Sequence, residues 1–232
     1  MRIQAFFAAI ILCSACIIGA RALSHPPTYY SHMPRTYSLA SYRINVVYVP
    51  HGTTRANVLF RTHCVDLSPA GYKFRQYGNW APMDYVEIEG KIISAINTRK
   101  PLPYLYCNEN TTTRTFLLHT ARHLNEISRK NPLHVHWVIA TGPIFYRSSS
   151  ERNINAVLRR SKIRPWDTTT RNALFISNNG ATCALVTRYG TAWDIIRLFF
   201  DHPEWNTIVF FDGGSSALSS ARNPVWITVQ KK

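Results

Sequence analysis

Short runs of apolar residues recur along the chain between turn residues, and most of them alternate with polar residues in the manner of β-strands. Two pairs of runs flank tight turns, Glu89-Gly90 in one pair and Asn178-Asn179-Gly180 in the other, and each pair predicts a β-hairpin. The segments expected to form strands are 42–49, 56–60, 85–96 (as a hairpin), 102–107, 134–139, 173–176, 182–187 and 208–211.

Three further segments have a helical period of apolar positions. Segment 115–129 is expected to be a helix, and segment 191–200 an amphipathic helix that stops before Pro203. Segment 150–164 is polar and basic with one apolar face, which fits either a helix or a surface insert. This order of elements predicts a single α+β domain, with a mixed or antiparallel sheet, hairpins and a few packed helices.

The first residues have the pattern of a targeting segment. Met1-Arg2 is basic, an apolar run follows, and small residues precede a cut expected after Ala22. We therefore expect a signal peptide at 1–22, an N-terminal extension at 23–41 and the folded domain at 42–232. No later segment is long and apolar enough for a transmembrane span, so the mature protein is expected to be secreted or extracytoplasmic, in a periplasm or an endomembrane lumen.

Three cysteines follow the expected cut, namely Cys64, Cys107 and Cys183. In an oxidising compartment two of them can pair, and the sequence does not choose the pair. No cysteine or histidine spacing matches a zinc finger, so no metal and no cofactor are predicted. His134 and His136 share one face of a strand, which fits either a metal site or an ordinary polar face.

The formal charge of the chain is +15, and removal of Arg2 and Arg21 with the signal peptide lowers it to about +13. A basic surface attracts polyanions, so an anionic glycan, a nucleic acid or an acidic membrane face is an expected partner.

The segment with the clearest chemistry follows the apolar run 208–211. Asp212 stands at the end of that run, where folds with buried strands often place functional groups. Gly213 and Gly214 allow the backbone to approach a ligand closely, and consecutive N–H groups in such a turn bind anions. The alternative is an ordinary turn with a solvated carboxylate.

Four motifs occur in an order that resembles the phosphodiester glycosidase family, the catalytic-domain type of the mannose-6-phosphate uncovering enzyme (N-acetylglucosamine-1-phosphodiester α-N-acetylglucosaminidase). The resemblance covers about 42–217 and is most specific from Ile139 onward. The motifs are Gly78-Asn79-Trp80, Thr141-Gly142-Pro143, Arg171-Asn172-Ala173-Leu174-Phe175-Ile176 and Asp212-Gly213-Gly214-Ser215-Ser216.

The resemblance implies a hydrolase that cuts a sugar phosphodiester at the anomeric carbon, without a cofactor. Asp212 matches the carboxylate of the family motif and suits stabilisation of an oxocarbenium ion, as base or nucleophile. Arg171 suits bidentate binding of the phosphate, and Ser216 matches the hydroxyl of the motif. We therefore predict Asp212, Ser216 and Arg171 as catalytic residues. The expected substrate-binding residues are Gly213, Gly214, Ser215, Asn79, Trp80 and Gly142.

The sequence departs from the family motifs at several positions, which puts substrate specificity and activity in question. These positions are Tyr77, Ala81, Phe175 and Ser215. Two other functions therefore stay open: a non-catalytic basic secreted protein of the same fold that binds anionic glycans or nucleic acid, and a phosphodiesterase that attacks phosphorus. Individual residues also have ordinary alternatives, since Arg171 suits a solvated hairpin charge, Gly142-Pro143 a plain turn, Trp80 a core position and Glu87 and Glu89 a solvated hairpin face.

Overall fold

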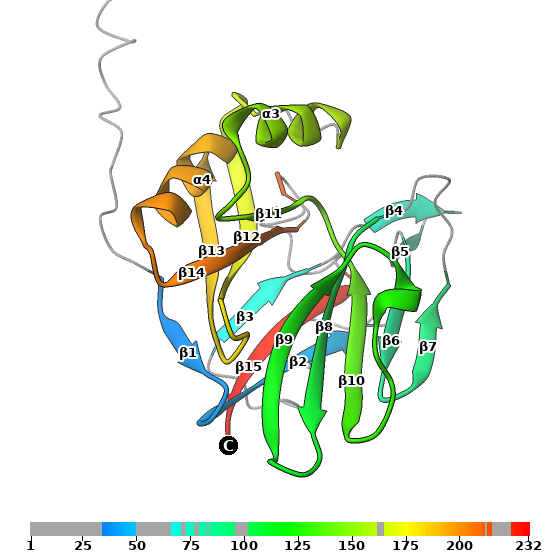
Figure 1. Ribbon diagram of the computed structural model, residues 1–232. Helices are drawn as coiled ribbons and strands as arrows, with labels where there is room; N and C mark the ends of the chain where they lie inside the picture. The colour runs from blue at the N-terminus through cyan, green and yellow to red at the C-terminus, as the bar shows by residue number, and fades with distance from the viewer. Residues whose placement is uncertain are drawn as a thin grey trace, which may run out of the picture. The chain divides into compact units, whose positions relative to one another are not determined.

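The computed structural model describes one compact unit, Pro34–Lys232. Within it the described residues are 34–49, 66–70, 73–76, 79–82, 84–95, 102–161, 165–211, 213–214 and 224–232. This part of the chain is built mainly from antiparallel β-sheets, with two α-helices (Figure 1).

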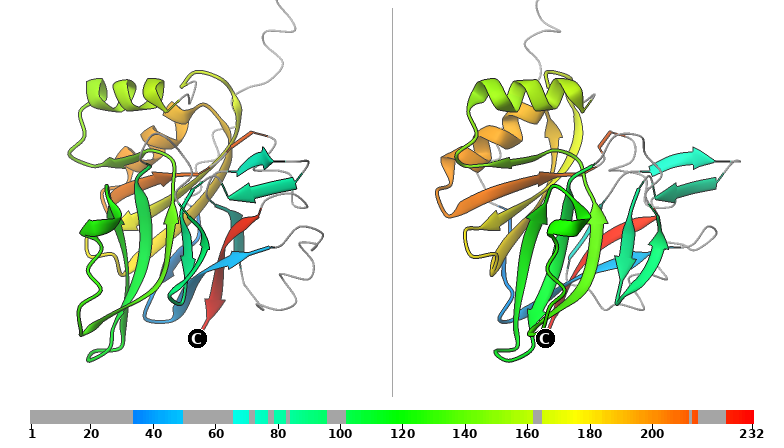
Figure 2. Two further views of the ribbon diagram at one scale, coloured as in Figure 1. Left: turned by 90° about the vertical axis from the view of Figure 1, so that its right-hand side faces the viewer. Right: turned by 45° about the vertical axis from the view of Figure 1, so that its right-hand side comes forward.

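Two five-stranded sheets form most of the fold (Figures 1 and 2). The first sheet has the strand order β1 (Thr36–Ser38), β13 (Thr182–Gly190), β12 (Thr169–Ser177), β14 (Trp205–Phe210), β11 (Ile144–Tyr146). The second sheet has the strand order β7 (Lys91–Ser94), β6 (Val86–Ile88), β10 (Leu133–Ala140), β8 (Tyr104–Asn110), β9 (Thr115–Ala121).

Two smaller sheets complete the described strands. The third sheet has the order β2 (Tyr42–Tyr48), β15 (Val225–Lys231), β3 (Asp66–Pro69). A two-stranded sheet joins β4 (Lys73–Gln76) and β5 (Asn79–Pro82). Because β2 and β15 pair along their whole length, from Tyr42 with Lys231 to Tyr48 with Val225, the two ends of the unit are joined.

Both α-helices lie on the side of the first sheet (Figure 1). Helix α3 (Glu151–Arg160) begins at Ser150, whose side chain accepts a hydrogen bond from the Asn153 N–H. Helix α4 (Ala192–Asp201) begins with a capping box between Thr191 and Asp194, and its buried face packs on β12, β13 and β14. A 3₁₀ turn, η1 (Leu124–Glu126), follows β9. Neither α-helix has the length and apolar character needed to cross a membrane, among the residues that the structure describes.

A large hydrophobic core joins the three larger sheets. Side chains from the first sheet meet those of the second and third sheets there, and most of them are almost completely buried. Representative members are Leu174, Val209, Leu105, Trp137, Ile44 and Ile227. Since burial of an apolar side chain contributes about 1.5–3 kcal/mol, this shared core holds the sheets together.

Polar contacts also fix the sheets against each other. The Trp137 indole N–H donates to the Ile44 carbonyl across 2.8 Å, which ties β10 to β2. The Leu118 N–H donates to the Gly180 carbonyl across 2.9 Å, which ties β9 to the β12–β13 turn. A β-carbon on Gly180 would lie 2.3 Å from the Leu118 carbonyl oxygen, so only glycine fits this turn.

The predicted α+β class with packed helices is wrong, because the fold is β-rich. Segment 115–129, predicted as a helix, instead forms strand β9 and the short η1 turn. Strand β9 pairs with β8 through a hairpin in which the Asn110 carboxamide accepts bonds from the Thr112 and Thr113 N–H groups. The apolar residues of the segment are compatible with a helix and with a strand, and the pairing with β8 selects the strand.

Most other predicted elements are confirmed. Both hairpins form at the expected turns, and segments 134–139, 191–200 and 208–211 form β10, α4 and β14. Segment 150–164 contains helix α3. The strand predicted at 56–60 lies outside the described residues. Apart from β9, six of the described strands were not predicted, namely β1, β3, β4, β5, β11 and β15, and β1 comes from the segment expected to be an extension.

Candidate functional site

Three of the four motifs come together at one end of the first sheet. The Gly142 N–H donates to the Phe210 carbonyl (2.9 Å), which places the Thr141-Gly142-Pro143 turn beside the end of β14. The Phe211 N–H donates to the Asn172 carbonyl (2.9 Å), so that the same end of β14 lies beside β12 at Arg171-Asn172. Motifs that are distant in sequence therefore share one edge of the fold.

The glycines after β14 allow a close approach of two backbones. A β-carbon on Gly213 would lie 2.9 Å from the Thr170 carbonyl oxygen, and Gly214 has a φ of +65°. The Gly214 N–H donates to the Thr170 carbonyl at 2.6 Å. This N–H is thereby committed to the fold, so Gly214 forms the turn and does not offer its N–H to an anion.

Arg171 is buried, with 8% of its surface exposed, so its interpretation as a solvated hairpin charge is wrong. It lies on β12, one residue from Thr170 and Asn172, and its Nη2 donates to the Asp167 carbonyl at 3.0 Å. Its neighbour Asn172 is fully buried and accepts a hydrogen bond from the Thr187 hydroxyl at 2.8 Å. Burial of a guanidinium is costly unless it is well partnered, which marks this position as specialised.

The remaining predicted site residues are not all covered by the structure. Asp212, Ser215 and Ser216 lie outside the described residues, so their places in the site stay predictions. Asn79 and Trp80 belong to strand β5, opposite Gln76 and Arg75 of β4, and their side chains lie outside the description. Tyr77 also lies outside the described residues.

Phe175, one of the departures from the family motifs, is fully buried in the core. Its ring packs edge-on against Phe199 of α4, with centroids 5.6 Å apart, and against Trp205 of β14. It lies four residues along β12 from Arg171, which is about 13 Å at the rise of a strand. The aromatic ring thus anchors α4 to the sheet.

Glu87 is not on a solvated face but is buried, with 3% of its surface exposed. Its carboxylate accepts two hydrogen bonds from the Arg129 guanidinium, at 2.6 and 2.7 Å, and one from the Tyr85 hydroxyl at 2.5 Å. The Arg129 guanidinium holds the pKa of Glu87 below its ordinary value, against the opposing effect of burial. Burial, reinforced by the Glu87 carboxylate, raises the pKa of Tyr85 to about 12. Glu87 therefore belongs to a closed ion-pair network.

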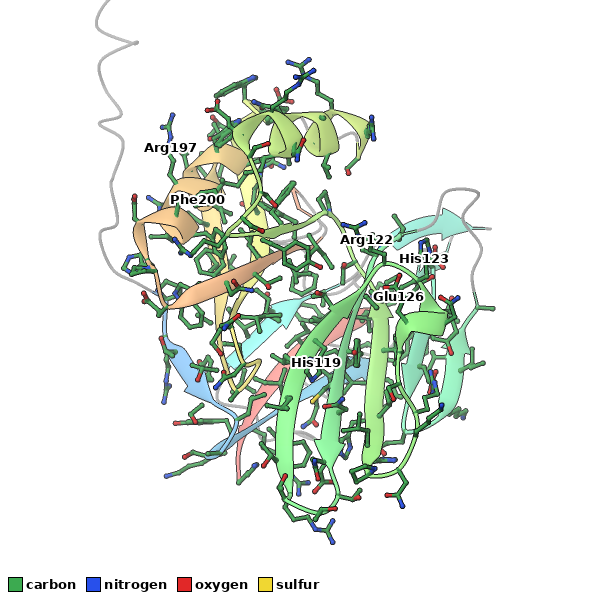
Figure 3. All side chains as sticks on the ribbon, viewed as in Figure 1. His119, Arg122, His123, Glu126, Arg197 and Phe200 are labelled. Atoms are coloured by element: carbon green, nitrogen blue, oxygen red, sulfur yellow. The ribbon has the colours of Figure 1, made fainter. Side chains whose placement is uncertain are left out.

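Polar side chains also gather where β9 ends, around Arg122, His123 and Glu126 (Figure 3). The Glu126 carboxylate accepts a hydrogen bond from the Arg122 N–H at 2.7 Å, which closes the turn before η1. On β9 itself, burial lowers the pKa of His119, and its ring stacks on Tyr106. We assign these residues to the stability of the turn and the sheet.

Two of the three cysteines that follow residue 22 are described, and both are free thiols. Cys107 and Cys183 are buried in the shared core, and Cys64 lies outside the described residues. Burial raises the pKa of Cys107 to about 12 and raises the pKa of Cys183 further. Neither thiol is a reactive nucleophile at neutral pH.

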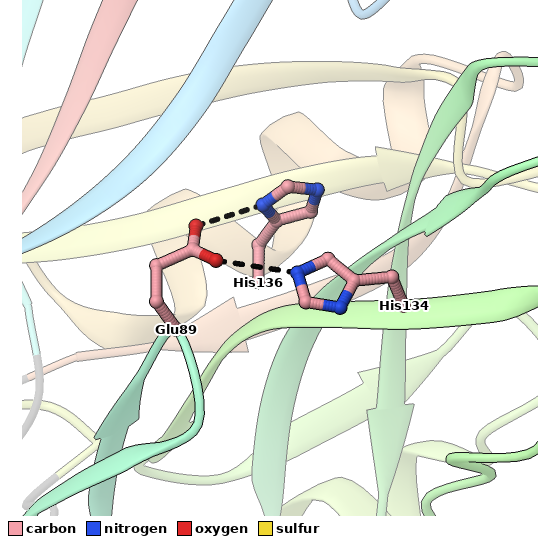
Figure 4. A group of neighbouring side chains, drawn as sticks. All are labelled: Glu89, His134 and His136. Atoms are coloured by element: carbon pink, nitrogen blue, oxygen red, sulfur yellow. Dashed lines mark hydrogen bonds and ion pairs between the residues drawn. The ribbon is translucent and has the colours of Figure 1, made fainter.

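His134 and His136 do share a face of β10, as the alternation predicts, and Glu89 of the β6–β7 turn joins them (Figure 4). Burial acts to raise the pKa of Glu89, but the hydrogen bonds with His136 and His134 outweigh it and lower that pKa. This meeting was not predicted, because it depends on the pairing of β6 with β10.

No family model matches the chain, and no curated protein is similar to it in sequence. Among solved structures, the chain is similar to the catalytic domain of zebrafish N-acetylglucosamine-1-phosphodiester alpha-N-acetylglucosaminidase (NAGPA), auto-inhibited by its pro-peptide. The TM-score is 0.59 at 12% sequence identity, over 84% of this chain and 74% of that chain. The two proteins therefore share a fold, as the motifs led us to expect.

Proposed function

We propose that this protein is a secreted phosphodiester glycosidase, a hydrolase that cleaves a sugar-1-phosphodiester to a free sugar and a phosphomonoester. The observation that carries the proposal is the meeting of Gly142, Arg171 and the Gly213-Gly214 turn at one end of the first sheet. The shared fold with an enzyme of that chemistry supports it.

The buried Arg171 is proposed to bind the phosphodiester group. A planar guanidinium carries five N–H donors in a fork that matches two phosphate oxygens, and the bond from Nη2 to the Asp167 carbonyl helps to fix the plane of that fork. Arg171 lies on β12, the central strand of the first sheet, and this rigid position orients its guanidinium. A fixed orientation favours binding of a charged leaving group.

Asp212 is proposed as the carboxylate that faces the anomeric carbon. During cleavage the bond between this carbon and the phosphate oxygen breaks, and positive charge develops on the sugar ring. Water supplies the new oxygen on the carbon, and the phosphomonoester leaves with the electron pair of the broken bond. Asp212 stabilises the cationic ring, as base towards that water or as nucleophile, while Ser216 and Arg171 stabilise the phosphate.

Gly213 and Gly214 are proposed to bring the chain after β14 against β12, so that Asp212 stands close to Arg171. Since the Gly214 N–H is bonded to Thr170, we assign the binding of the anion to side chains rather than to this backbone group.

The test is hydrolysis of a panel of sugar-1-phosphodiesters that vary in sugar and aglycone, with release of free sugar as the readout. We expect turnover of at least one member, and its loss in Asp212→Asn with little change in thermal midpoint. A protein that hydrolyses no diester yet binds heparin or nucleic acid in a salt-sensitive manner would overturn the proposal and favour the basic binding protein.

Secretion is part of the same proposal. Expression of the full chain in a secreting host should give an exported protein that begins at Leu23. Retention of residues 1–22 on the exported protein would contradict the expected cleavage.

A further inference from the structure

The geometry points to a binding site for a first-row divalent transition-metal ion such as Zn²⁺, formed by Glu89, His134 and His136. This site is separate from the proposed glycosidase site. His136 lies six residues before Gly142, which corresponds to about 20 Å at the rise of a strand.

The backbone places the three ligands before any ion arrives. Glu89 and Gly90 form the β6–β7 turn with φ values of +48° and +74°. The Glu89 N–H donates to the His136 carbonyl at 2.6 Å, which locks the turn against β10. A non-glycine residue in the left-handed region is uncommon, and such residues are more frequent at functional sites.

A bulge in β10 falls at His136. Val135 pairs with Asn108 and Trp137 pairs with Cys107, so His136 has no opposite residue on β8. Bulges of this kind redirect a side chain and are over-represented next to functional sites. The bulge places the His136 ring against Phe116, with centroids 5.0 Å apart.

The distances fit a bound ion. The Glu89 oxygens lie 2.8 Å from Nδ1 of His136 and 3.2 Å from Nε2 of His134, and the three ligand atoms all lie within 4.8 Å of one another (Figure 4). Tetrahedral ligands at the usual Zn–N and Zn–O lengths are about 3.3 Å apart, so small side-chain rotations suffice. Two imidazoles and one carboxylate with an open position suit Zn²⁺ and its neighbours in the first row.

Glu109 lies where such a site needs outer support, as an ion-pair contact without a hydrogen bond. Its Oε2 lies 3.4 Å from Nε2 of His136, the ring nitrogen that does not face Glu89. This nitrogen is buried, and the Glu109 side chain is only 13% exposed. A carboxylate on the far nitrogen orients a metal-bound histidine and raises its basicity.

Charges of both signs surround the site: two carboxylates contact His136, and Arg43 and Lys232 lie over the Phe116 ring that packs against it. The chain has 27 lysines and arginines against 12 acidic residues, yet two carboxylates converge on His136. Arg114 offsets part of this charge, since it lies 3.5 Å from Glu109, but it is largely exposed. The Glu89 and His134 side chains are 61% and 49% exposed, so that an ion reaches them from solvent and keeps a position for water or a ligand.

The test is titration of the purified, metal-stripped protein with Zn²⁺, by calorimetry, followed by the visible spectrum of the Co²⁺ form. We expect one saturable site and a tetrahedral Co²⁺ spectrum. Both should be lost in the double variant His134→Ala/His136→Ala, and Glu109→Gln should weaken binding by roughly 10- to 100-fold.

The matched control is His202→Ala, because His202 also pairs with a carboxylate, Glu204, at 3.3 Å, but only as a two-residue contact. This variant should bind Zn²⁺ as the wild type does. Circular dichroism of each metal-free variant shows whether it is folded. Absence of a one-to-one site in the wild type, or equal binding by the folded double variant, would overturn the proposal.

Discussion

The contact between the β12–β13 turn and β9 can be tested by a matched pair of glycine substitutions. Gly180 and Gly90 both have a positive φ, +72° and +74°, so alanine carries the same conformational cost of about 1–2 kcal/mol at each. Their surroundings differ. A β-carbon on Gly180 would lie 2.3 Å from the Leu118 carbonyl oxygen, whereas a β-carbon on Gly90 meets nothing within 4 Å.

The extra loss of stability at Gly180 comes from the displacement of the β12–β13 turn. Relief of the overlap requires the turn to withdraw from β9, which breaks the 2.9 Å hydrogen bond from the Leu118 N–H, a net loss of about 1 kcal/mol. Leu118 is buried in the shared core, so the displacement also disturbs packing at about 1–3 kcal/mol. Gly180→Ala should therefore lower the free energy of unfolding by about 3–6 kcal/mol, and Gly90→Ala by about 1–2 kcal/mol.

Urea unfolding followed by far-ultraviolet circular dichroism measures both changes under the same conditions. In a thermal melt the midpoints of the two variants should differ by roughly 4–16 °C, at about 2–4 °C per kcal/mol for a domain of this size. Equal losses at the two glycines would refute the close contact between the turn and β9.

Three more predictions concern the helix support, the acid stability and the proposed phosphate ligand. Arg147 donates four hydrogen bonds to carbonyls at and beyond the end of α4, so Arg147→Met should lower the free energy of unfolding by about 3 kcal/mol. The control Arg197→Met, on the exposed face of α4 (Figure 3), should change it by less than about 0.5 kcal/mol. Because the pKa of Glu87 is lowered in the folded state, its ionised carboxylate stabilises the fold above pH 4.5, and this stabilisation is lost as the pH falls through the folded-state pKa. The urea midpoint of Glu87→Gln should therefore fall less steeply below pH 4.5 than that of the wild type, and an equal slope would count against this role. Arg171→Lys should reduce kcat/KM for the cleaved diester by roughly 10- to 100-fold, because a point charge replaces a planar fork, and full activity would exclude bidentate phosphate binding.

The sequence predicted the local elements better than the architecture. Turn residues and alternation located the β12–β13 hairpin, the His134–His136 strand and the strand before Asp212, because these signals act over a few residues. The apolar residues of segment 115–129 fit a helical period, which predicts a helix, but they are also compatible with a strand. Only the pairing with β8, which the sequence does not display, selects the strand.

The candidate sites depend on contacts that are distant in sequence. The motif order led us to expect Arg171 near the Gly213-Gly214 turn, and the bonds from Phe211 to Asn172 and from Gly214 to Thr170 bring these segments together. The burial of Arg171 and of Glu87 was not predicted, because charged side chains are mostly exposed unless they are paired, and the sequence does not display their partners. The cluster at Glu89 was missed because it joins a turn to a strand about 45 residues away.

The most direct test of the proposed function is hydrolysis of a cleaved sugar-1-phosphodiester in oxygen-18 water, with mass analysis of both products. Attack at the anomeric carbon puts the label in the anomeric hydroxyl of the free sugar and none in the phosphomonoester. The proposal predicts this pattern, and it predicts no labelled product with Asp212→Asn. Label in the phosphate would contradict cleavage at carbon and would show that the protein is a phosphodiesterase.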